Sequence, residues 1–314
     1  MSQALTILRA AADPTRLRIL ALVEAMELSV GELAQILCQS QPRVSRHVKI
    51  LADAGLIARQ REGSWMFLRG GDPALLRPLL DLVARVDGVQ AEHQADLARL
   101  ASVRAERVAA SERYFAQHAE SWDALRSLHV ADTEVEQAIC ATLGSAKIDT
   151  LVDIGTGTGR MLTLLGHQAG QAIGIDRSSE MLRVARGKCE AAGLANVQLR
   201  QGDMFALPLE KASADVVILH QVLHYADAPS DAIAEAARIL RNNGRLLIVD
   251  FAPHHREELR SQHAHSRLGF EDRQMLGWIT AAGLNAKTIS HLQGGELTVT
   301  LWLGTKTAAQ DKRA

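Results

Sequence analysis

The sequence predicts a multidomain protein in which a mainly helical N-terminal domain precedes an α/β domain with a mostly parallel sheet. Two patterns lead to this prediction. Apolar residues recur at helical spacing up to about residue 55 and give way to a short hairpin pattern, whereas strand and helix patterns alternate from Asp149 onward. A chain of 314 residues, 47% of them hydrophobic and 23% charged, is also long enough for two cores.

The first helices are marked by a cap. Apolar residues recur at helical spacing from Leu5 to Glu24, but the segment ADPTRLRIL starts a fresh helix within this stretch. Asp13 occupies its cap position and Pro14 its first turn, an arrangement that helix N-termini favour. We therefore expect two helices here.

A second pair of helices and a hairpin follow. Ser29 is the expected N-cap of a helix that ends at Leu37, and after the turn CQSQ another helix opens at Pro42 and ends at Gly55. LIARQ and WMFLRG then alternate like two short strands around the turn REGS. This order of elements predicts a winged helix-turn-helix.

The second helix of such a motif enters the major groove of DNA, and its first turns face base edges. Val44, Val48 and Leu51 repeat on the inward side, which leaves the polar side chains on the outward side. Gln and Arg can read adenine and guanine, and the hairpin would straddle the phosphate backbone. The predicted DNA-binding residues are Ser40, Gln41, Arg43, Ser45, Arg46, His47, Lys49, Arg59, Arg61 and Ser64. The alternative is an ordinary three-helix bundle with solvated charges.

Charge and composition favour contact with DNA and disfavour a membrane protein, disulfides and structural zinc. Residues 1–70 contain nine Lys and Arg against six Asp and Glu, although the whole chain has a net charge of −1. A basic excess at one end is what contact with DNA phosphates needs. No apolar run approaches the length of a membrane span and no signal-peptide pattern is present, so we expect a cytoplasmic protein without membrane contact. Cys38, Cys140 and Cys189 are scattered, which favours reduced, buried thiols over disulfides or structural zinc.

The segments ADPTRLRIL, LSVGELAQIL and SQPRVSRHVKILADAGLIARQREGSWMFLR resemble the ArsR/SmtB family of dimeric winged-helix repressors over about residues 5–70. The resemblance implies a homodimer, which we expect to bind an inverted repeat in double-stranded DNA. Metal sensors of the family carry a Cys pair on the helix before the turn, or Asp and His ligands on the last helix. This chain has Cys38 alone and no His in PALLRPLLDLVARV, so no metal site is predicted.

Residues 73–111 predict long helices rich in Ala, Leu, Glu and Arg. Such a segment would connect the two domains, and its apolar stripe could pair with a second copy of the chain. The predicted domains are a winged-helix DNA-binding domain over residues 1–72, a helical connector and dimerisation region over 73–111, and the α/β domain over 112–308.

Seven strands are expected after Asp149: TLVDIG, QAIGID, VQLRQGD, ADVVILH, GRLLIVD, NAKTIS and ELTVTLWLG. Amphipathic helices are predicted between the first five, and the near-continuous apolar strands imply a parallel sheet covered on both faces. Only HLQGG separates the last two strands, which is too short for a crossover, so the last strand should run antiparallel.

The segment VDIGTGTGR places Gly155, Gly157 and Gly159 between a strand and a helix. Glycines let such a turn pass close to a ligand, and the helix N-terminus offers free N–H groups. Asp176 ends the second strand, seventeen residues after Gly159, where a carboxylate can accept hydrogen bonds from both hydroxyls of a ribose. These features predict a nucleotide-like ligand.

With GDMFALP and HQVLHY added, residues 112–304 resemble class I S-adenosylmethionine-dependent methyltransferases, most of all the ubiquinone and menaquinone C-methyltransferases. The resemblance implies a seven-stranded Rossmann-like methyltransferase fold that binds S-adenosylmethionine or S-adenosylhomocysteine. It places Asp153 at the methionine part, Asp176 at the ribose and Asp203 at the adenine amine. The whole implied set is Asp153, Gly155, Thr156, Gly157, Gly159, Asp176, Arg177, Met181, Gly202, Asp203, Met204, His220, Gln221, His224 and Tyr114. NAD is the alternative ligand, and the antiparallel last strand disfavours it.

In the same family the helix before the first strand closes over the cofactor, which makes Tyr114, Phe115 and Trp122 candidates for a lid. Ordinary core packing of these rings is the alternative. No catalytic residue is assigned. The candidate bases for methyl transfer, none of them diagnostic, are His220, His224, Tyr225, Asp250 and His254. His255, His263 and His265 add imidazoles that fit a pocket lining or a surface helix better than a metal site.

An ArsR-type head joined to a methyltransferase-like body resembles a group of S-adenosylhomocysteine-responsive regulators of methionine-cycle genes. The resemblance implies a transcriptional repressor in which the S-adenosyl compound is an effector. An active methyltransferase that carries a DNA-binding module stays open as the alternative.

Overall fold

The structure, a computed structural model, describes residues 3–62, 65–87, 91–122, 132–294 and 297–307. The chain divides into two compact units, Met1–Ala110 and Ser111–Ala314. The division falls within one helix, α6 (Ala91–His118). The three domains expected from the sequence, with their boundaries, stay a prediction.

The N-terminal unit begins with α1 (Gln3–Ala11) and α2 (Pro14–Ala25), which confirms the two helices expected there. Asp13 caps α2, because its carboxylate accepts the backbone N–H of Arg16 at 3.0 Å. The cap satisfies one of the backbone donors that the first turn of a helix leaves without an internal partner.

The helix-turn-helix consists of α3 (Val30–Leu37) and α4 (Gln41–Asp53). A capping box starts α3: the Ser29 hydroxyl accepts the Glu32 N–H at 3.2 Å, and the Glu32 carboxylate accepts the Ser29 N–H at 2.7 Å. Cys38 follows α3 in a left-handed conformation, with φ of 52°, and this turns the chain toward α4.

The wing is an antiparallel hairpin of β2 (Ile57–Glu62) and β3 (Trp65–Gly70). A two-residue strand, β1 (Leu28–Ser29), pairs with β3 and completes the order β1-β3-β2. Two residues carry no alternating pattern, so the sequence did not predict β1. The winged helix-turn-helix itself is confirmed.

Two further helices follow the wing, α5 (Pro73–Asp87) and α6. Leu100 and Val103 of α6 are buried in the same core as α2, α3 and α4, so this part of its apolar stripe is not available to a second copy of the chain. α6 has 28 residues, but neither it nor any other described helix is long and apolar enough to cross a membrane.

Charged groups fix α6 to the helix-turn-helix. Asp96 is fully buried, and its two oxygens accept the Arg18 guanidinium of α2 at 2.6 and 2.7 Å. This hydrogen bond raises the pKa of Arg18. Farther along α6, Arg107 donates from Nε to Glu32 of α3 at 2.8 Å. Bidentate pairing of this kind fixes orientation as well as position.

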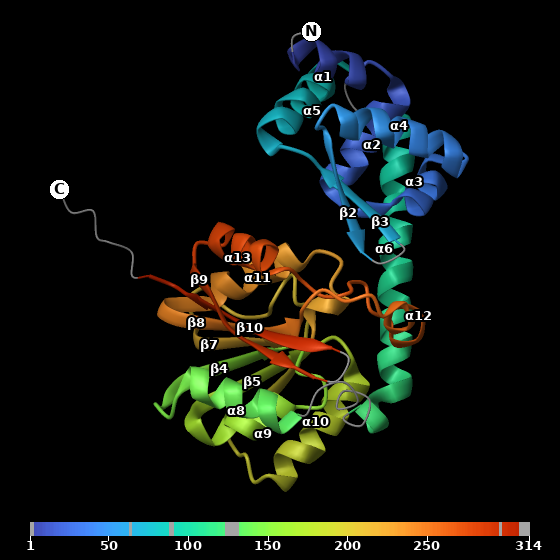
Figure 1. Cartoon of the computed structure of the whole chain (residues 1–314). Helices are drawn as coiled ribbons and strands as arrows, with labels where there is room; N and C mark the ends of the chain where they lie inside the picture. Colours follow the sequence, from blue (N-terminus) through green and yellow to red (C-terminus); the bar gives the residue numbers. More distant parts are fainter. Residues whose placement is uncertain (1–2, 63–64, 88–90, 123–131, 295–296, 308–314) are drawn as a thin grey trace, which may run out of the picture. The chain divides into compact units, whose positions relative to one another are not determined.

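The second unit is built on a seven-stranded sheet of order β6-β5-β4-β7-β8-β10-β9 (Figure 1). Its strands are β4 (Ile148–Ile154), β5 (Ala169–Asp176), β6 (Val197–Gln201), β7 (Ala214–His220), β8 (Leu240–Phe251), β9 (Asn285–Gln293) and β10 (Thr298–Thr305). β4 to β8 run parallel, and β10 is antiparallel to both β8 and β9, as predicted. The strand order reverses between β4 and β7, the position at whose carboxyl edge such sheets bind ligands.

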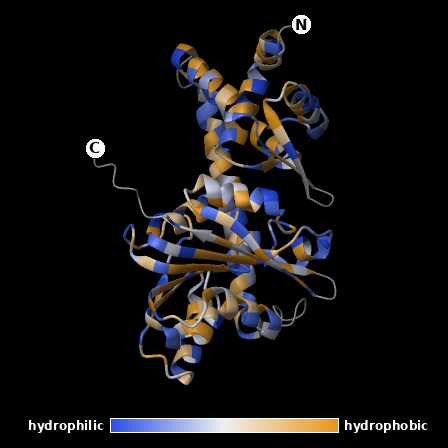
Figure 2. Ribbon diagram, turned by 60° about the vertical axis from the view of Figure 1, so that its left-hand side comes forward, coloured by the Kyte–Doolittle hydropathy of each residue, from blue (hydrophilic) through white to orange (hydrophobic). Residues whose placement is uncertain are grey.

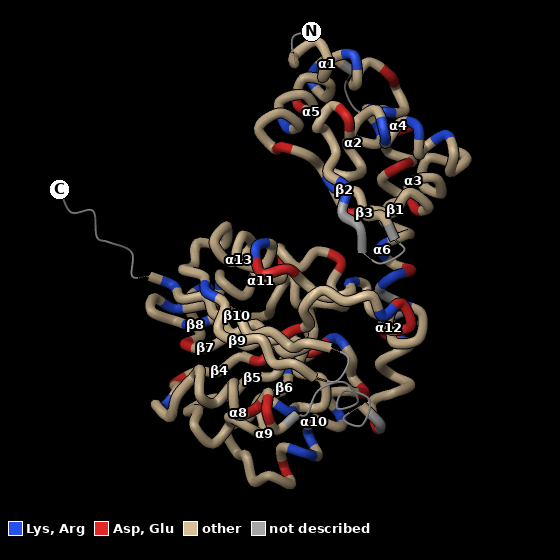
Figure 3. The backbone as a smooth tube through the Cα atoms, in the orientation of Figure 1, with Lys and Arg blue, Asp and Glu red and all other residues tan. Residues whose placement is uncertain are grey.

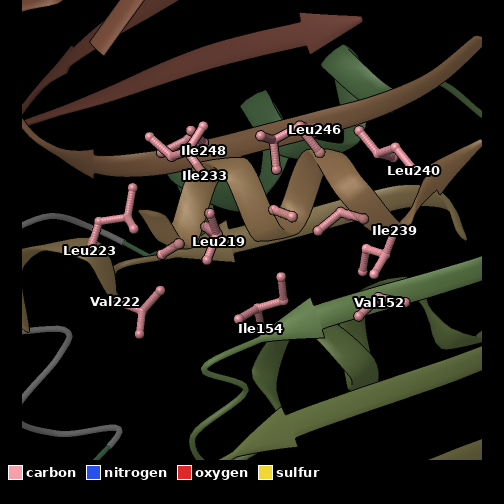
Figure 4. Close-up of a cluster of buried hydrophobic side chains, with 14 of the residues drawn as sticks. Val152, Ile154, Leu219, Val222, Leu223, Ile233, Ile239, Leu240, Leu246 and Ile248 are labelled. Atoms are coloured by element: carbon pink, nitrogen blue, oxygen red, sulfur yellow. The ribbon is translucent and has the colours of Figure 1, made fainter. Parts of the chain in front are cut away.

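Helices cover both faces of the sheet. On one face α11 (Pro229–Ile239) and α13 (Asp272–Ala281) pack over a core that includes Val152 and Ile154 of β4 (Figure 4). The other face, with Leu151, is covered by α8 (Asp132–Leu143), α9 (Arg160–Leu165), α10 (Ser179–Ala191) and α12 (Glu257–His263). The strands between these layers are mainly hydrophobic (Figure 2), which confirms the sheet covered on both faces.

One expected helix is absent. Helices were predicted between each of the first five strands, but the link from β6 to β7, residues 202–213, contains turns, bends and an isolated β-bridge between Asp203 and Ala206. Pro208 lies in this link, and Leu207 is the side chain that it buries in the core. Leu207, with Met204 and Leu209 partly buried against the same core, replaces the amphipathic face that a helix would need.

Candidate functional site

The glycine loop leaves β4 and turns sharply into α9. Gly155, Gly157 and Gly159 have φ of 69°, 52° and 82°, in the left-handed region that favours glycine. A Cβ on Gly155 would lie 2.3 Å from Val222 Cγ2, so only glycine fits where this loop passes the segment after β7. The N–H groups of Gly155 and Thr156 donate to the Ile175 carbonyl of β5, at 2.8 and 3.0 Å.

Two carboxylates lie beneath this loop. Asp153 is 1% exposed and accepts the Thr156 hydroxyl at 2.6 Å. Asp176 ends β5, and its two oxygens accept the N–H groups of Gly157 at 2.8 Å and Ser178 at 2.9 Å. Burial raises the pKa of Asp176, and these backbone hydrogen bonds oppose the rise. The backbone therefore orients the Asp176 carboxylate, whose remaining lone pairs can accept a ligand's hydroxyls.

Asp203 and Arg177, both predicted to contact the ligand, pair with each other. The Arg177 guanidinium donates to Asp203 and lies 3.8 Å from Glu112 of α6. Asp203 also accepts the Phe205 N–H at 3.0 Å. A ligand amine that binds Asp203 would compete with the Arg177 guanidinium.

Three other predicted contacts lie in the same region with different surroundings. Gly202 is closely packed, since a Cβ there would be 3.0 Å from Ile175. Met204 is partly buried against the core of the α11 face. Met181 is 1% exposed within α10, so its side chain belongs to the protein interior. The contact of Met181 with the ligand stays a prediction.

The carboxyl end of β7 carries His220, Gln221 and His224. Gln221 has φ of 50°, a strained value for a residue with a side chain, and its N–H donates to Val249 at 2.7 Å. His224 is 2% exposed, and its Nδ1 lies 2.7 Å from the buried Asp250 carboxylate. A neutral imidazole that donates from Nδ1 keeps a lone pair on Nε2, so this pair has the chemistry of a proton acceptor.

Four aromatic side chains, Tyr114, Phe115, Trp122 and Tyr225, pack together. They are called the lid cluster below after the lid role expected for three of them, which stays a prediction. Phe115 has its ring centroid 4.8 Å from that of Tyr225 and 5.3 Å from that of Trp122. Tyr114 lies 5.9 Å from Phe115. A Cβ on Gly157 would lie 3.6 Å from Trp122 Nε1, so the cluster reaches the glycine loop. Burial raises the pKa of Tyr225 well above its usual value, so this phenol stays neutral.

His255, His263 and His265 lie in or next to α12. His265 stacks on His224, with ring centroids 4.1 Å apart, and His263 contacts Tyr114. Among the residues that the structure describes, no group of three His, Cys, Asp or Glu side chains could hold a metal ion. No local pattern predicts the contact between His263 and Tyr114, because the two residues are separated by 149 positions.

On α4 the structure separates the predicted DNA-binding side chains from the core. Val44, Val48 and Leu51 are buried, and α4 and the wing carry basic residues (Figure 3). The predicted residues that lie exposed are Ser40, Gln41, Arg43, Ser45, Arg46, Lys49 and Arg59. His47 instead turns toward the Asp13 cap, with Nδ1 3.7 Å from the carboxylate. The Arg61 side chain and Ser64 lie outside the described residues.

One expectation about the cysteines is wrong. Cys189 is buried and Cys140 is half-buried, but Cys38 is exposed, because it occupies the turn that ends α3 rather than a core position.

Comparison with known families assigns both units. Residues 13–59 match the model of the arsR family of bacterial regulatory proteins, and residues 146–291 match a methyltransferase domain. The chain joins an ArsR-type helix-turn-helix to a methyltransferase domain. Both resemblances expected from the sequence are confirmed.

Several relatives found by sequence are named as methyltransferases. The uncharacterized methyltransferase YcgJ of Bacillus subtilis is 33% identical over 104 residues, which are 33% of this chain and 41% of the relative. Demethylmenaquinone methyltransferase of Tropheryma whipplei is 29% identical over 121 residues, which are 38% of this chain and 49% of the relative. The chain thus spans less than half the length of either relative.

A solved structure shows the same fold. The crystal structure of YcgJ from Bacillus subtilis superposes with a TM-score of 0.50 at 20% identity, and covers 56% of this chain and 99% of that chain. The predicted methyltransferase fold is therefore confirmed.

Proposed function

We propose that this chain is a DNA-binding transcriptional regulator whose methyltransferase domain binds S-adenosylmethionine or S-adenosylhomocysteine as an effector. The proposal rests on the contacts that α6 makes along its length. Its earlier turns are fixed to α2 and α3 through Asp96 and Arg107, and its last turns supply Tyr114 and Phe115 of the lid cluster. A ligand that changes the packing of the lid cluster therefore acts on the helix that supports the helix-turn-helix.

The geometry of the glycine loop supports the choice of ligand. The left-handed glycines allow close approach of a ligand to the backbone, and Asp176 is oriented by the loop's own N–H group. A carboxylate at this place in a parallel sheet suits the two hydroxyls of a ribose. The fold shared with YcgJ and the matched methyltransferase domain fit an S-adenosyl compound.

The surface of the N-terminal unit supports a homodimer. α1 and α5 expose large apolar side chains: Leu5 is 47%, Leu8 55%, Leu82 57% and Val86 74% exposed. Exposed apolar groups gathered on two helices favour association with a second copy. A dimer would present two α4 helices to an inverted repeat in DNA. Repression of methionine-cycle genes completes the proposal and rests on the resemblance alone.

The test is a gel-shift titration with an inverted repeat from the gene's own promoter, with and without each S-adenosyl compound. We expect at least one of them to change the DNA affinity several-fold, as a coupling of about 1–3 kcal/mol would do. Asp176→Asn should bind DNA as the wild type does and lose the response. Arg46→Ala should lose DNA affinity and keep the heat of ligand binding measured by calorimetry. Unchanged DNA affinity with both compounds would contradict the proposal.

A further inference from the structure

Two arginines of α6 contact α3, the first helix of the helix-turn-helix, at its two ends. Arg107 donates from two nitrogens to one carboxylate oxygen of Glu32, in the first turn of α3, at 2.8 and 2.5 Å. Arg99 donates to the backbone carbonyl of Ile36, near the end of α3, at 3.3 Å. The later residue of α6 contacts the start of α3 and the earlier residue contacts its end, so the two helices run in opposite directions.

Apolar side chains of both helices lie in one core. Leu100 and Val103 of α6 are 6% and 4% exposed, and they share this core with Leu33 of α3, which has no exposed surface. The attraction between apolar surfaces has no direction, so it resists separation of the two helices more than sliding of one along the other. A charge-assisted hydrogen bond has a fixed geometry, and it therefore sets the position of α6 along α3.

The Arg107 contact is the stronger of the two. The side chains of Arg107 and Glu32 are 21% and 20% exposed, whereas that of Arg99 is 44% exposed and its hydrogen bond to α3 is longer. Water screens exposed charges, so the half-buried pair contributes more. The other oxygen of Glu32 accepts the Ser29 N–H at 2.7 Å. Arg107 therefore binds the same carboxylate that caps α3.

Arg107 also lies close to the end of the first unit. It stands three residues before Ala110, and α6 continues from there into the second unit as far as His118. Three residues are less than one turn of an α-helix. A shift or rotation of α6 at the boundary therefore reaches the Arg107 guanidinium over a single turn.

We propose that Arg107 is a positioning residue that couples the ligand site of the second unit to the helix-turn-helix: a bound ligand changes the position of α6, and the contact with Glu32 transmits this change to α3. The inference rests on the proposed function, because it names the residue through which the effector acts. It requires no contact of Arg107 with ligand or DNA. Both binding reactions should therefore persist when Arg107 is replaced.

The experiment is a gel-shift titration of the full chain with an inverted repeat from the gene's own promoter, without ligand and with saturating S-adenosylmethionine or S-adenosylhomocysteine. The measured quantity is the response ratio, the DNA dissociation constant with ligand divided by that without. The wild-type ratio should differ from one several-fold. Arg107→Gln should bring it close to one, and calorimetry should show that this variant binds the ligand as tightly as the wild type does.

Glu32→Gln tests the other partner of the contact. Glutamine suits this capping position as glutamate does, so its amide oxygen can still accept the Ser29 N–H, while the charge that binds Arg107 is lost. We expect the same loss of the response ratio. The double variant Glu32→Gln/Arg107→Gln should lose no more than either single variant, because all three remove one contact.

Arg104→Gln is the matched control. Arg104 is exposed on the same helix, so its replacement removes the same charge without touching the contact with Glu32, and the response ratio should stay at the wild-type value. Thermal unfolding shows whether each variant is folded. If Arg104→Gln lowers the ratio as much as Arg107→Gln does, the effect comes from the charge of α6 and the inference is wrong.

The response ratio also separates coupling from a merely structural role. If Arg107→Gln and Glu32→Gln weaken DNA binding equally with and without ligand, the ratio stays at the wild-type value; the inference is then overturned and the proposed function stands. If the wild type itself shows a ratio of one with both compounds, the proposed function fails, and this inference fails with it.

Discussion

At the scale of single residues, the shape of the glycine loop depends on positions that favour glycine over any residue with a side chain. Gly155 and Gly157 both have positive φ, but their surroundings differ. A Cβ on Gly155 would lie 2.3 Å from Val222 Cγ2, whereas a Cβ on Gly157 would have Trp122 Nε1 at 3.6 Å as its nearest neighbour. The first glycine is required by backbone conformation and packing together, and the second by conformation alone.

This difference can be measured. Gly155→Ala should destabilise the chain by roughly 2–4 kcal/mol, because left-handed strain and overpacking against Val222 add. Gly157→Ala, the matched control, should cost only the strain, about 1 kcal/mol. Urea unfolding gives both values, and equal losses for the two variants would contradict the packing argument. Gly155→Ala should also lose the heat of ligand binding.

At the scale of elements, α6 is held to the N-terminal unit by a buried carboxylate. Asp96 has no exposed surface, and it accepts Arg18 with both oxygens and Arg99 at 3.3 Å. Removing one partner of a buried pair leaves the other charge without compensation, which costs more than the pair itself contributes.

Asp96→Ala should therefore reduce the free energy of unfolding by roughly 3 kcal/mol, the usual cost of breaking a buried pair. Glu92 lies 3.8 Å from the same guanidinium but is 70% exposed, so Glu92→Ala should change stability by no more than about 0.5 kcal/mol. Urea unfolding of the two variants side by side is the measurement. A small effect of Asp96→Ala would mean that water reaches Arg18 once the carboxylate is gone.

At the scale of the whole molecule, the exposed apolar side chains of α1 and α5 predict self-association. Leu82 and Val86 lie four residues apart on α5, so they share one face of the helix. The double substitution of both residues by Glu should convert a dimer to a monomer in sedimentation experiments, because two charges cannot be buried in an apolar contact. Phe205→Glu, in the second unit and 37% exposed, is the control and should leave the dimer intact. A wild type that is monomeric at micromolar concentration would refute the prediction.

Local features were the ones that the sequence predicted well. The Asp13 cap, the Ser29 capping box and the glycine turn depend on residues a few positions apart, so their patterns are visible in the chain. The inward side of α4 and the alternation of strands and helices follow from periodicity in the same way.

Features that depend on distant residues could not be predicted. Arg18 and Asp96 are 78 positions apart, and Tyr114 and His263 are 149 apart, so nothing local marks either pair. Pairing of β1 with β3, and the link from β6 to β7 without a helix, are likewise decided by tertiary contacts. His47 lies with Nδ1 3.7 Å from the Asp13 carboxylate, a proximity between residues 34 positions apart that no local pattern marks, and its role as a DNA contact stays a prediction.

The Glu32 carboxylate makes two contacts: one oxygen accepts the Ser29 N–H and the other accepts the Arg107 guanidinium. One carboxyl group therefore both caps the N-terminus of α3 and binds α6. A displacement of Arg107 that moves this carboxylate also weakens its hydrogen bond to the Ser29 N–H. The first turn of α3 can then fray before the rest of the helix moves. The hydrogen bond between Glu32 and Arg107 therefore joins the N-terminus of α3, the helix that precedes α4, to α6 within the first unit.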